Sequence, residues 1–210
     1  HCKMLTMKLY GDLLSPFVRM CLVTAHEVGL AGKVEQVVTR VNPTAVNADL
    51  ARLSPVAKVP ILVTDHNHPL YDSRVIIEYL CHVSGNKTLI PDDGVKRFRV
   101  LTLMALGQAV AEAGVAQRYE TAVRPAGLQW REWMDRQALR VNAEFDDLEN
   151  AWDKDLQEVT AGSIAAAVAL AYLDFRIPDW LWREGRPKLT AFHESFSARP
   201  SMQATTLNPA

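Results

Sequence analysis

The hydrophobic pattern of this chain changes near residue 84, and that change limits the fold more than any other feature. Before it, short apolar runs alternate with segments at helical spacing, a mixture typical of an α/β domain. After residue 95, every apolar segment follows helical spacing. The sequence therefore predicts an α/β domain over residues 7–83, a linker over 84–95 and an all-helical domain over 96–210.

The first domain is expected to form a mixed sheet covered by helices, because its elements follow the order βαβ and then ββα. Ser15 and Asp72 stand where helix N-caps are expected, and Pro16 suits a first helical turn. Strands are expected at 7–10, 34–38, 59–63 and 69–71, and helices at 16–28 and 73–83. The buried face of the second helix is expected to carry Val75, Ile76, Tyr79 and Leu80. Residues 45–53 fit either a short helix or an irregular turn.

The second domain has one segment that is apolar on all sides, Ile164 to Leu173. Its 10 residues are about half of what a membrane span needs, so we expect a buried helix from Ser163 to Arg176. Other helices are expected around Phe98 to Ala109, around Met134 to Trp152 and from Lys188 to Ala198, with Gly114 as a candidate break and Pro200 as a stop.

Composition narrows the function classes. The chain has 23 basic and 24 acidic residues, a net charge of −1, which argues against binding of a polyanion such as nucleic acid. His1-Cys2-Lys3 resembles the remnant of an expression tag, with native starts at Met4 or Met7, so residues 1–6 are set aside. The remaining Cys21 and Cys81 form no disulfide framework, and no signal peptide is expected; a cytoplasmic protein follows.

Three short segments could carry chemistry, although each also has an ordinary structural explanation. Ser15-Pro16-Phe17 places a hydroxyl at a helix N-terminus, where anions are favoured, or simply caps the helix. Val59-Pro60 opens a strand; a cis bond there would leave backbone groups for an extended peptide, and an edge-strand proline is the alternative. Asp72-Ser73 offers a carboxylate and a hydroxyl at a second helix N-terminus, or only a cap.

The order of these segments resembles a known family. A strand, Ser15-Pro16-Phe17, a helix, Lys58-Val59-Pro60 and then Asp72-Ser73 is similar to the thioredoxin-like N-terminal domain of cytosolic glutathione S-transferases. The helical half, including Tyr172 to Arg176, is similar to their C-terminal domain. The resemblance is greatest to bacterial members that have a serine at the catalytic position.

The resemblance implies a glutathione transferase that uses glutathione as a substrate and forms a homodimer. The six histidines show no metal-ligand spacing beyond His66-x-His68 in a turn, so no metal is expected, and the charge balance and short apolar runs predict no nucleic-acid or membrane partner. Ser15 would donate a hydrogen bond to the glutathione sulfur and favour its thiolate. The implied glutathione-binding residues are Lys58, Val59, a cis Pro60, Asp72, Ser73 and, from the partner subunit, Gln108.

A second substrate, a small electrophile, would bind near Leu13, Leu14, Arg118, Tyr119, Arg124, Tyr172 and Arg176. Those arginines favour either an anionic electrophile or structural salt bridges. The family's activity is conjugation or peroxide reduction, and the alternative is a non-catalytic relative that binds proteins in a stress response. Disulfide chemistry is disfavoured because Ser15-Pro16-Phe17-Val18 contains no thiol.

One segment departs from the family pattern. The buried helix in the family begins with a Ser/Thr-x-x-Asp capping box, and here Ser163 is followed by Ala166, which cannot return the second hydrogen bond. On this basis the sequence predicts that Ala166→Asp raises the melting temperature.

Overall fold

The computed structural model describes residues 6–207, so the expected tag remnant at residues 1–3 lies outside the described part of the chain. Within that range the chain forms two compact units, one of residues 6–90 with 200–207 and the other of residues 91–199. The first unit contains a mixed sheet with helices, and the second is helical. This confirms the fold class that the sequence predicts.

The sheet of the first unit has the strand order β2-β1-β3-β4. The strands are β1 (Met7–Tyr10), β2 (Val34–Val37), β3 (Ile61–Val63) and β4 (Pro69–Leu70). β2 is parallel to β1, whereas β3 is antiparallel to β1 and β4 to β3. Tyr10 pairs with Ile61, so the end of β1 and the start of β3 meet at the same end of the sheet.

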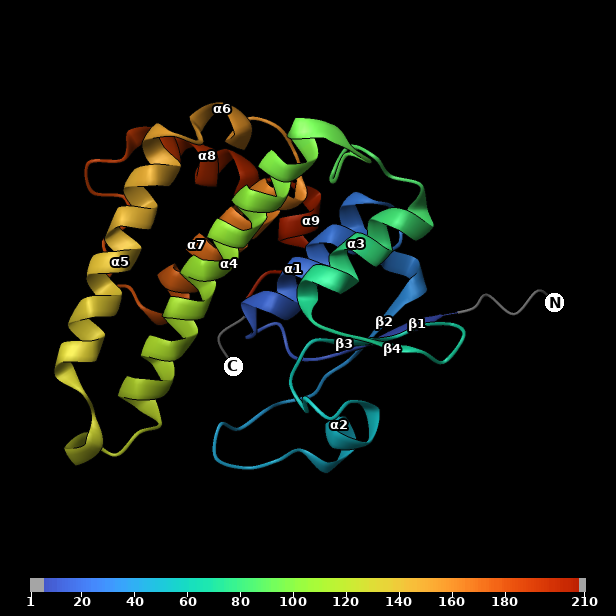
Figure 1. Cartoon of the computed structure of the whole chain (residues 1–210), viewed down its shortest axis with the longest axis horizontal. Helices are drawn as coiled ribbons and strands as arrows, with labels where there is room; N and C mark the ends of the chain where they lie inside the picture. Colours follow the sequence, from blue (N-terminus) through green and yellow to red (C-terminus); the bar gives the residue numbers. More distant parts are fainter. Residues whose placement is uncertain (1–5, 208–210) are drawn as a thin grey trace. The chain divides into compact units, whose positions relative to one another are not determined.

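Helices cover both faces of this sheet (Figure 1). α1 (Pro16–Glu27) and α3 (Ser73–Ser84) lie on one face, and α2 (Ala48–Leu53) lies on the other; a 3₁₀ turn, η1 (Ala31–Lys33), precedes β2. The ambiguous segment at 45–53 is thus a helix from Ala48, because the Asn47 side chain accepts hydrogen bonds from the N–H groups of Asp49 and Leu50.

The buried face of α3 differs in part from the expected one. Its buried residues are Ser73, Ile76, Ile77, Leu80 and Cys81. Val75 is 47% exposed and Tyr79 is half-buried, so the expectation was wrong for these two. Successive helical residues turn by about 100°, so Val75 and Tyr79, four residues apart, share a stripe beside the buried one.

The last described residues belong to the first unit. α9 (Pro200–Gln203) begins at Pro200, where the sequence suggests only a stop, and packs against α1. The buried Arg19 of α1 donates hydrogen bonds to the Met202 carbonyl and to the Thr205 hydroxyl, both at 3.3 Å. The expected helical domain over 96–210 therefore does not include residues 200–207.

The second unit is built from helices. They are α4 (Gly94–Ala122), η2 (Ala126–Leu128), α5 (Arg131–Asn150), α6 (Asp153–Leu156), α7 (Ala161–Arg176) and α8 (Pro187–Ser197). α4 and α5 lie side by side in Figure 1, and α4 continues unbroken through Gly114, where a break was expected. α5 ends before Trp152, and the short α6 was not anticipated.

α4 is long and apolar enough, at 29 residues and a mean hydropathy of 1.3 in its most apolar window, to cross a membrane. Half of that window is buried inside the protein, as in a core helix. Its main partner is α7.

Close packing of α4 on α7 forms the core of the second unit. A Cβ atom on Gly107 of α4 would lie 2.6 Å from the Ala166 nitrogen and 2.7 Å from the Ala165 carbonyl carbon. A Cβ atom on Gly162 of α7 would lie 2.8 Å from Leu103. Glycine at these two positions therefore lets the two backbones approach more closely than any side chain would allow.

The N-terminus of α7 has a complete capping box, one turn earlier than expected. Thr160 is the N-cap; its hydroxyl accepts from Ser163 N at 3.2 Å, and the Ser163 hydroxyl accepts from Thr160 N at 2.9 Å. Ala166 is fully buried against α4. The expected benefit of Ala166→Asp was therefore wrong, because the substitution would place a carboxylate in a closely packed interior.

Thr160→Ala should lower the free energy of unfolding by about 1 kcal/mol, since one backbone N–H loses its acceptor. Thr121→Ala is the matched control, because the exposed Thr121 hydroxyl bonds only to the Gln117 carbonyl within its own helix. Urea denaturation measures both, and equal stability of the two variants would contradict the assigned cap.

Gly107→Ala should lower the free energy of unfolding by about 1–3 kcal/mol, because its methyl group would meet the α7 backbone, which cannot move aside cheaply. Gly127→Ala provides the control, since a Cβ atom at Gly127 meets nothing within 4 Å. The comparison uses the same denaturation measurement. An unchanged Gly107→Ala variant would show that the two helices can separate without loss.

Candidate functional site

Ser15 lies at the N-terminus of α1 and is its N-cap, as the sequence predicts. Its Oγ accepts a hydrogen bond from Val18 N at 3.4 Å, a long bond for this geometry. Its own O–H proton has no acceptor within residues 6–207, and the side chain is partly exposed. Ser15 can therefore cap the helix and donate a hydrogen bond to a ligand at the same time.

Asp12 holds the loop that leads to Ser15. Its Oδ1 accepts from Leu14 N and its backbone carbonyl accepts from Ser15 N, both at 3.0 Å. Its Oδ2 accepts from Arg40 Nε at 3.0 Å. Sequence reasoning missed this positioning role, although an Asp after a strand and a Gly is a typical turn signal.

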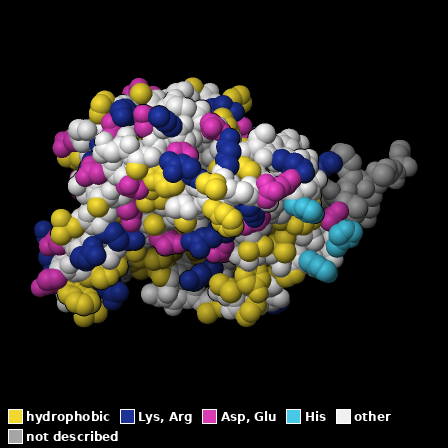
Figure 2. Space-filling model, turned by 45° about the horizontal axis from the view of Figure 1, so that its top comes forward, with side chains coloured by type: hydrophobic (Ala, Val, Ile, Leu, Met, Phe, Trp, Pro, Cys, Tyr) yellow, Lys and Arg dark blue, Asp and Glu magenta, His cyan; other side chains and the backbone are white. Residues whose placement is uncertain are grey.

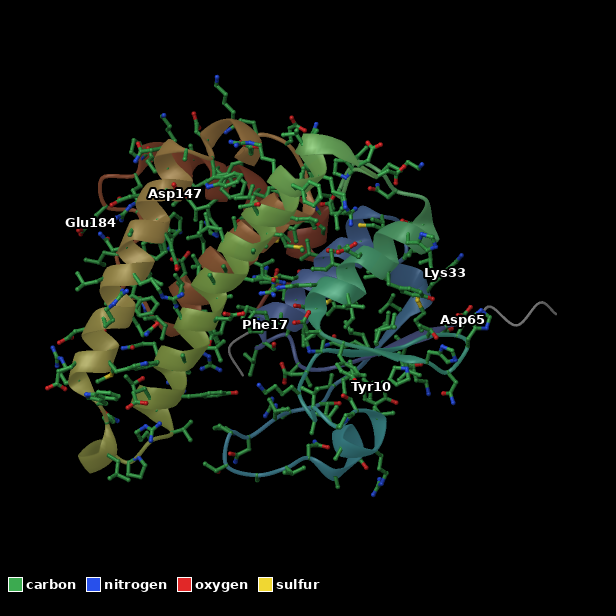
Figure 3. All side chains as sticks on the ribbon, in the orientation of Figure 1. Tyr10, Phe17, Lys33, Asp65, Asp147 and Glu184 are labelled. Carbon is green, nitrogen blue, oxygen red and sulfur yellow. The ribbon has the colours of Figure 1, made fainter. Side chains whose placement is uncertain are left out.

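Gly11 fixes the start of the same loop. It has a φ of +149°, and a Cβ atom there would lie 2.3 Å from a Val18 methyl group, so only glycine fits. The Gly11 carbonyl accepts from Gln36 Nε2 at 2.9 Å. Tyr10 and Phe17, labelled in Figure 3, mark the strand end and the first helical turn on either side of this loop.

Val59 lies just before β3, and its bond to Pro60 is cis, as the resemblance implies. Strand β3 starts at Ile61, two residues later than expected. Neither the N–H nor the C=O of Val59 forms a hydrogen bond within the described residues. Lys58 beside it is exposed. This short stretch therefore offers free backbone groups to an extended peptide and a cation close by.

Asp72 caps α3, again as predicted. Its Oδ1 accepts from Arg74 N at 2.9 Å, while its Oδ2 has no partner within residues 6–207, so the exposed carboxylate has one oxygen free. Ser73 is only 3% exposed, and its carbonyl accepts from Cys21 Sγ at 3.8 Å. The side chain of Ser73 is thus less available to a ligand than its neighbour.

The fold brings these three segments to one end of the sheet. The pairing of Tyr10 with Ile61 places the loop that leads to Ser15 at the same end of the sheet as Val59 and Pro60. The contact between Cys21 of α1 and Ser73 places the start of α3 near the first turns of α1. A hydroxyl, a free strand edge and a carboxylate therefore converge within the first unit.

The second unit groups four of the predicted second-substrate residues. Arg118, Tyr119 and Arg176 all act electrostatically on Tyr172, which places them around its hydroxyl. Arg124 instead pairs with the carboxylate of Glu120 at 2.7 Å, so its role is structural.

The remaining predicted residues have other surroundings. Gln108 is 1% exposed and has a polar partner inside the protein, so the structure gives no support to its expected reach toward a partner's ligand. Leu13 lines a cavity of about 180 Å³ that also contacts Leu22, His26 and Thr205, and Leu14 lies between Leu13 and Ser15 on the loop.

A larger hollow of about 530 Å³ in the second unit is not a good candidate for a site. The charged groups around it neutralise one another, as in the pairs of Arg99 with Asp155 at 2.6 Å and of Lys188 with Asp153 at 3.5 Å. Figure 2 likewise shows basic and acidic side chains interspersed over the visible face. Among residues 6–207, no group of three or more His, Cys, Asp or Glu side chains is arranged to hold a metal.

Comparison with known proteins agrees with this geometry. A family model for the glutathione S-transferase N-terminal domain matches residues 14–83, and one for the C-terminal domain matches residues 131–195. The uncharacterised GST-like protein YibF of Escherichia coli K12 is 33% identical over 204 residues, which cover 95% of this chain and 98% of YibF.

The chain belongs to the glutathione S-transferase family.

Two crystal structures of a glutathione transferase family member from Pseudomonas fluorescens Pf-5 are similar to this chain. One, with bound glutathione, has 38% identity and a TM-score of 0.94 over 97% of this chain and all of the other. The second, with bound S-(propanoic acid)-glutathione, has 37% identity and a TM-score of 0.88 over 95% and 98%.

The two cysteines among residues 6–207, Cys21 and Cys81, are unsuited to thiol chemistry. Both are buried, and burial together with the nearby Asp72 carboxylate raises the pKa of the Cys21 thiol far above its usual range. Burial and Glu78 raise the pKa of Cys81 to about 11. Both thiols therefore stay protonated at neutral pH, and since the thiolate is the reactive form, neither serves as a nucleophile.

A thiol reagent at pH 8 should leave Cys21 and Cys81 unmodified in the folded protein, since only about one thiol in a thousand is ionised at a pKa near 11. Both should react once guanidinium unfolds the chain. The measurement uses a Cys2→Ser background, so that only these two thiols are counted. Modification of Cys21 in the folded state at the rate of a free thiol would contradict the assignment.

Proposed function

We propose that the chain is a serine-type glutathione transferase that activates the glutathione thiol for attack on small electrophiles or for reduction of peroxides. The observation that carries this proposal is that, within residues 6–207, the Ser15 hydroxyl proton at the N-terminus of α1 and the backbone N–H and C=O of Val59, at the same end of the sheet, have no partner. The crystallised relatives with glutathione or a glutathione thioether support the choice of substrate.

Each glutathione-binding residue contacts a different part of the tripeptide. Val59 pairs through its backbone with the cysteinyl part, next to the cis Pro60. Asp72, with one free carboxylate oxygen, holds the γ-glutamyl ammonium, and the N-terminal turn that starts at Ser73 suits the carboxylate beside it. The exposed Lys58 lies near the acidic groups of the peptide.

Ser15 lowers the pKa of the bound thiol. A free thiol has a pKa of about 8.5, so only a few per cent is thiolate at neutral pH. A hydrogen bond to a charged acceptor contributes about 1.5–3 kcal/mol, which corresponds to roughly one to two pKa units. The positive end of the α1 dipole acts in the same direction.

The reaction consumes the thiolate in one of two ways. In conjugation, the sulfur lone pair forms an S–C bond and either expels a leaving group or adds to a double bond, whose far carbon then takes a proton from water. In peroxide reduction, two glutathiones supply two electrons and two protons, and the products are glutathione disulfide, an alcohol and water.

The second substrate binds at Arg118, Tyr119, Tyr172 and Arg176 of the second unit. We further propose that the enzyme is a cytoplasmic homodimer that serves detoxification. Gln108 is left out of the glutathione site because its side chain is buried.

Ser15→Ala should lower kcat/KM for conjugation by roughly ten- to a hundredfold and return the pKa of bound glutathione toward about 8.5. Ultraviolet absorbance of the thiolate against pH gives that pKa directly. Ser15→Thr, which keeps a hydroxyl, should restore most of the activity. Thr160→Ala is the stability control, because it likewise removes a helix cap, that of α7 in the second unit, and leaves the Ser15 loop unchanged.

An unshifted thiol pKa in Ser15→Ala would overturn the role of Ser15. If wild-type protein binds glutathione but neither ionises its thiol nor turns over any acceptor, the non-catalytic alternative is favoured. Absence of binding at millimolar glutathione would refute the proposal itself.

A further inference from the structure

Helices α4 and α7 run parallel, and their contacts place Arg118 level with Arg176. Leu103 faces Gly162, and Gly107 faces Ala165 and Ala166. Gly114 faces Tyr172 and Leu173, so every α7 residue in these contacts lies 58 or 59 positions after its α4 neighbour. One helical turn beyond Gly114, the same offset pairs Arg118 with Arg176.

These two arginines have no acidic partner in the part of the chain that the structure describes. Neither forms an ion pair or a hydrogen bond within residues 6–207; Arg176 only lies over the neighbouring Phe175 ring. Other arginines of the same unit are neutralised, Arg124 by Glu120 and Arg183 by Asp174 at 2.6 Å. Two neighbouring guanidiniums that repel each other are stabilised by an anion, and a carboxylate matches their geometry.

The Tyr172 hydroxyl completes the cluster. The ring is buried, with the side chain 4% exposed, and the hydroxyl has no hydrogen-bond partner within the described part of the chain. Among the described residues, the side-chain oxygens that lack both a hydrogen-bond partner and contact with solvent are Gln117 Oε1 and Glu144 Oε2. The Tyr172 hydroxyl is therefore accessible to solvent. Arg118, Arg176 and Tyr119 act on it electrostatically, and no carboxylate is among the groups that do.

Burial raises the pKa of Tyr172 to about 12, so at neutral pH the phenol is protonated and can donate a hydrogen bond. The cluster therefore presents three donors, two of them cationic, and no acceptor that would repel an anion.

We propose that Arg118, Arg176 and the Tyr172 hydroxyl bind a carboxylate on the electrophile, so that the enzyme prefers carboxylate-bearing acceptors over neutral ones. This inference rests on the proposed transferase function and specifies its substrate class. Tyr119, 37% exposed beside the cluster, offers an aromatic edge to the body of such a substrate.

A matched pair of acceptors tests the preference: 4-chloro-3-nitrobenzoate and its neutral analogue 4-chloro-3-nitrobenzamide. In both, the glutathione thiolate forms an S–C bond at the chlorinated carbon, and chloride leaves with the bonding electron pair. The ratio of the kcat/KM values for the two acceptors is compared between variants. The intrinsic reactivities of the acceptors contribute equally to this ratio in every variant, so only the protein changes it.

Arg118→Met and Arg176→Met should each lower kcat/KM for the benzoate by roughly ten- to a hundredfold while changing that for the benzamide less than about threefold. Arg118→Lys should retain part of the preference, because it keeps a charge but loses the planar fork. Arg131→Met is the control, since the exposed Arg131 pairs with Asp135. Equal losses on both acceptors, or none on the benzoate, would overturn the proposal.

Calorimetry measures the binding of the two reaction products, the glutathione conjugates of the benzoate and of the benzamide. It tests the carboxylate site independently of the proposed catalytic function. The carboxylate conjugate should bind at least tenfold more tightly than the amide conjugate, and Arg118→Met should remove the difference. This difference in affinity is expected even if the wild-type protein turns over neither acceptor. Absence of turnover would contradict only the proposed transferase activity. Equal affinities of the two conjugates for the wild-type protein would overturn the carboxylate site.

Discussion

The close approach of α4 to α7 is the constraint on which the second unit depends. Glycines at 107, 114 and 162 remove the side chains that would otherwise hold the two helices apart. The residues from Ile164 to Leu170 are then all buried in the interior. Because both helices are held along their whole contact, their relative register is fixed by backbone packing, whereas a contact of long side chains would leave room to slide.

This register also determines what the ends of the helices carry. Gly114 accepts the Tyr172 ring, and one turn later the helices present Arg118 and Arg176 at the same level. The arginines are thus brought together by glycines far from any substrate. In the first unit, the pairing of β1 with β3 likewise brings Ser15 and Val59 to the same end of the sheet. Within residues 6–207, both clusters therefore keep hydrogen-bond donors with no acceptor: the Ser15 hydroxyl in one, and the two guanidiniums in the other.

Sequence predicts features that depend on neighbouring residues, and fails where distant residues decide. Ser15 and Asp72 were recognised as caps because capping is local to one helical turn. The Thr160 box was missed because the family pattern pointed three residues downstream, although both of its residues are polar and correctly spaced. The attachment of α9 to Arg19, the exposure of Val75 and the burial of Gln108 depend on tertiary packing, which periodicity alone does not specify.

The site shows why three weak sequence signals together indicate more than each does singly. A serine cap, a strand-opening proline and an Asp-Ser pair are each common in proteins without ligands. A register shift of one residue between β1 and β3 would turn the side chains of either strand to the opposite face, so their pairing is firmly set by the core. Given that pairing, the cap hydroxyl and the free edge at Val59 must lie at one end of the sheet. Their convergence is therefore a property of the fold, and a ligand with a thiol in an extended peptide matches both groups at once.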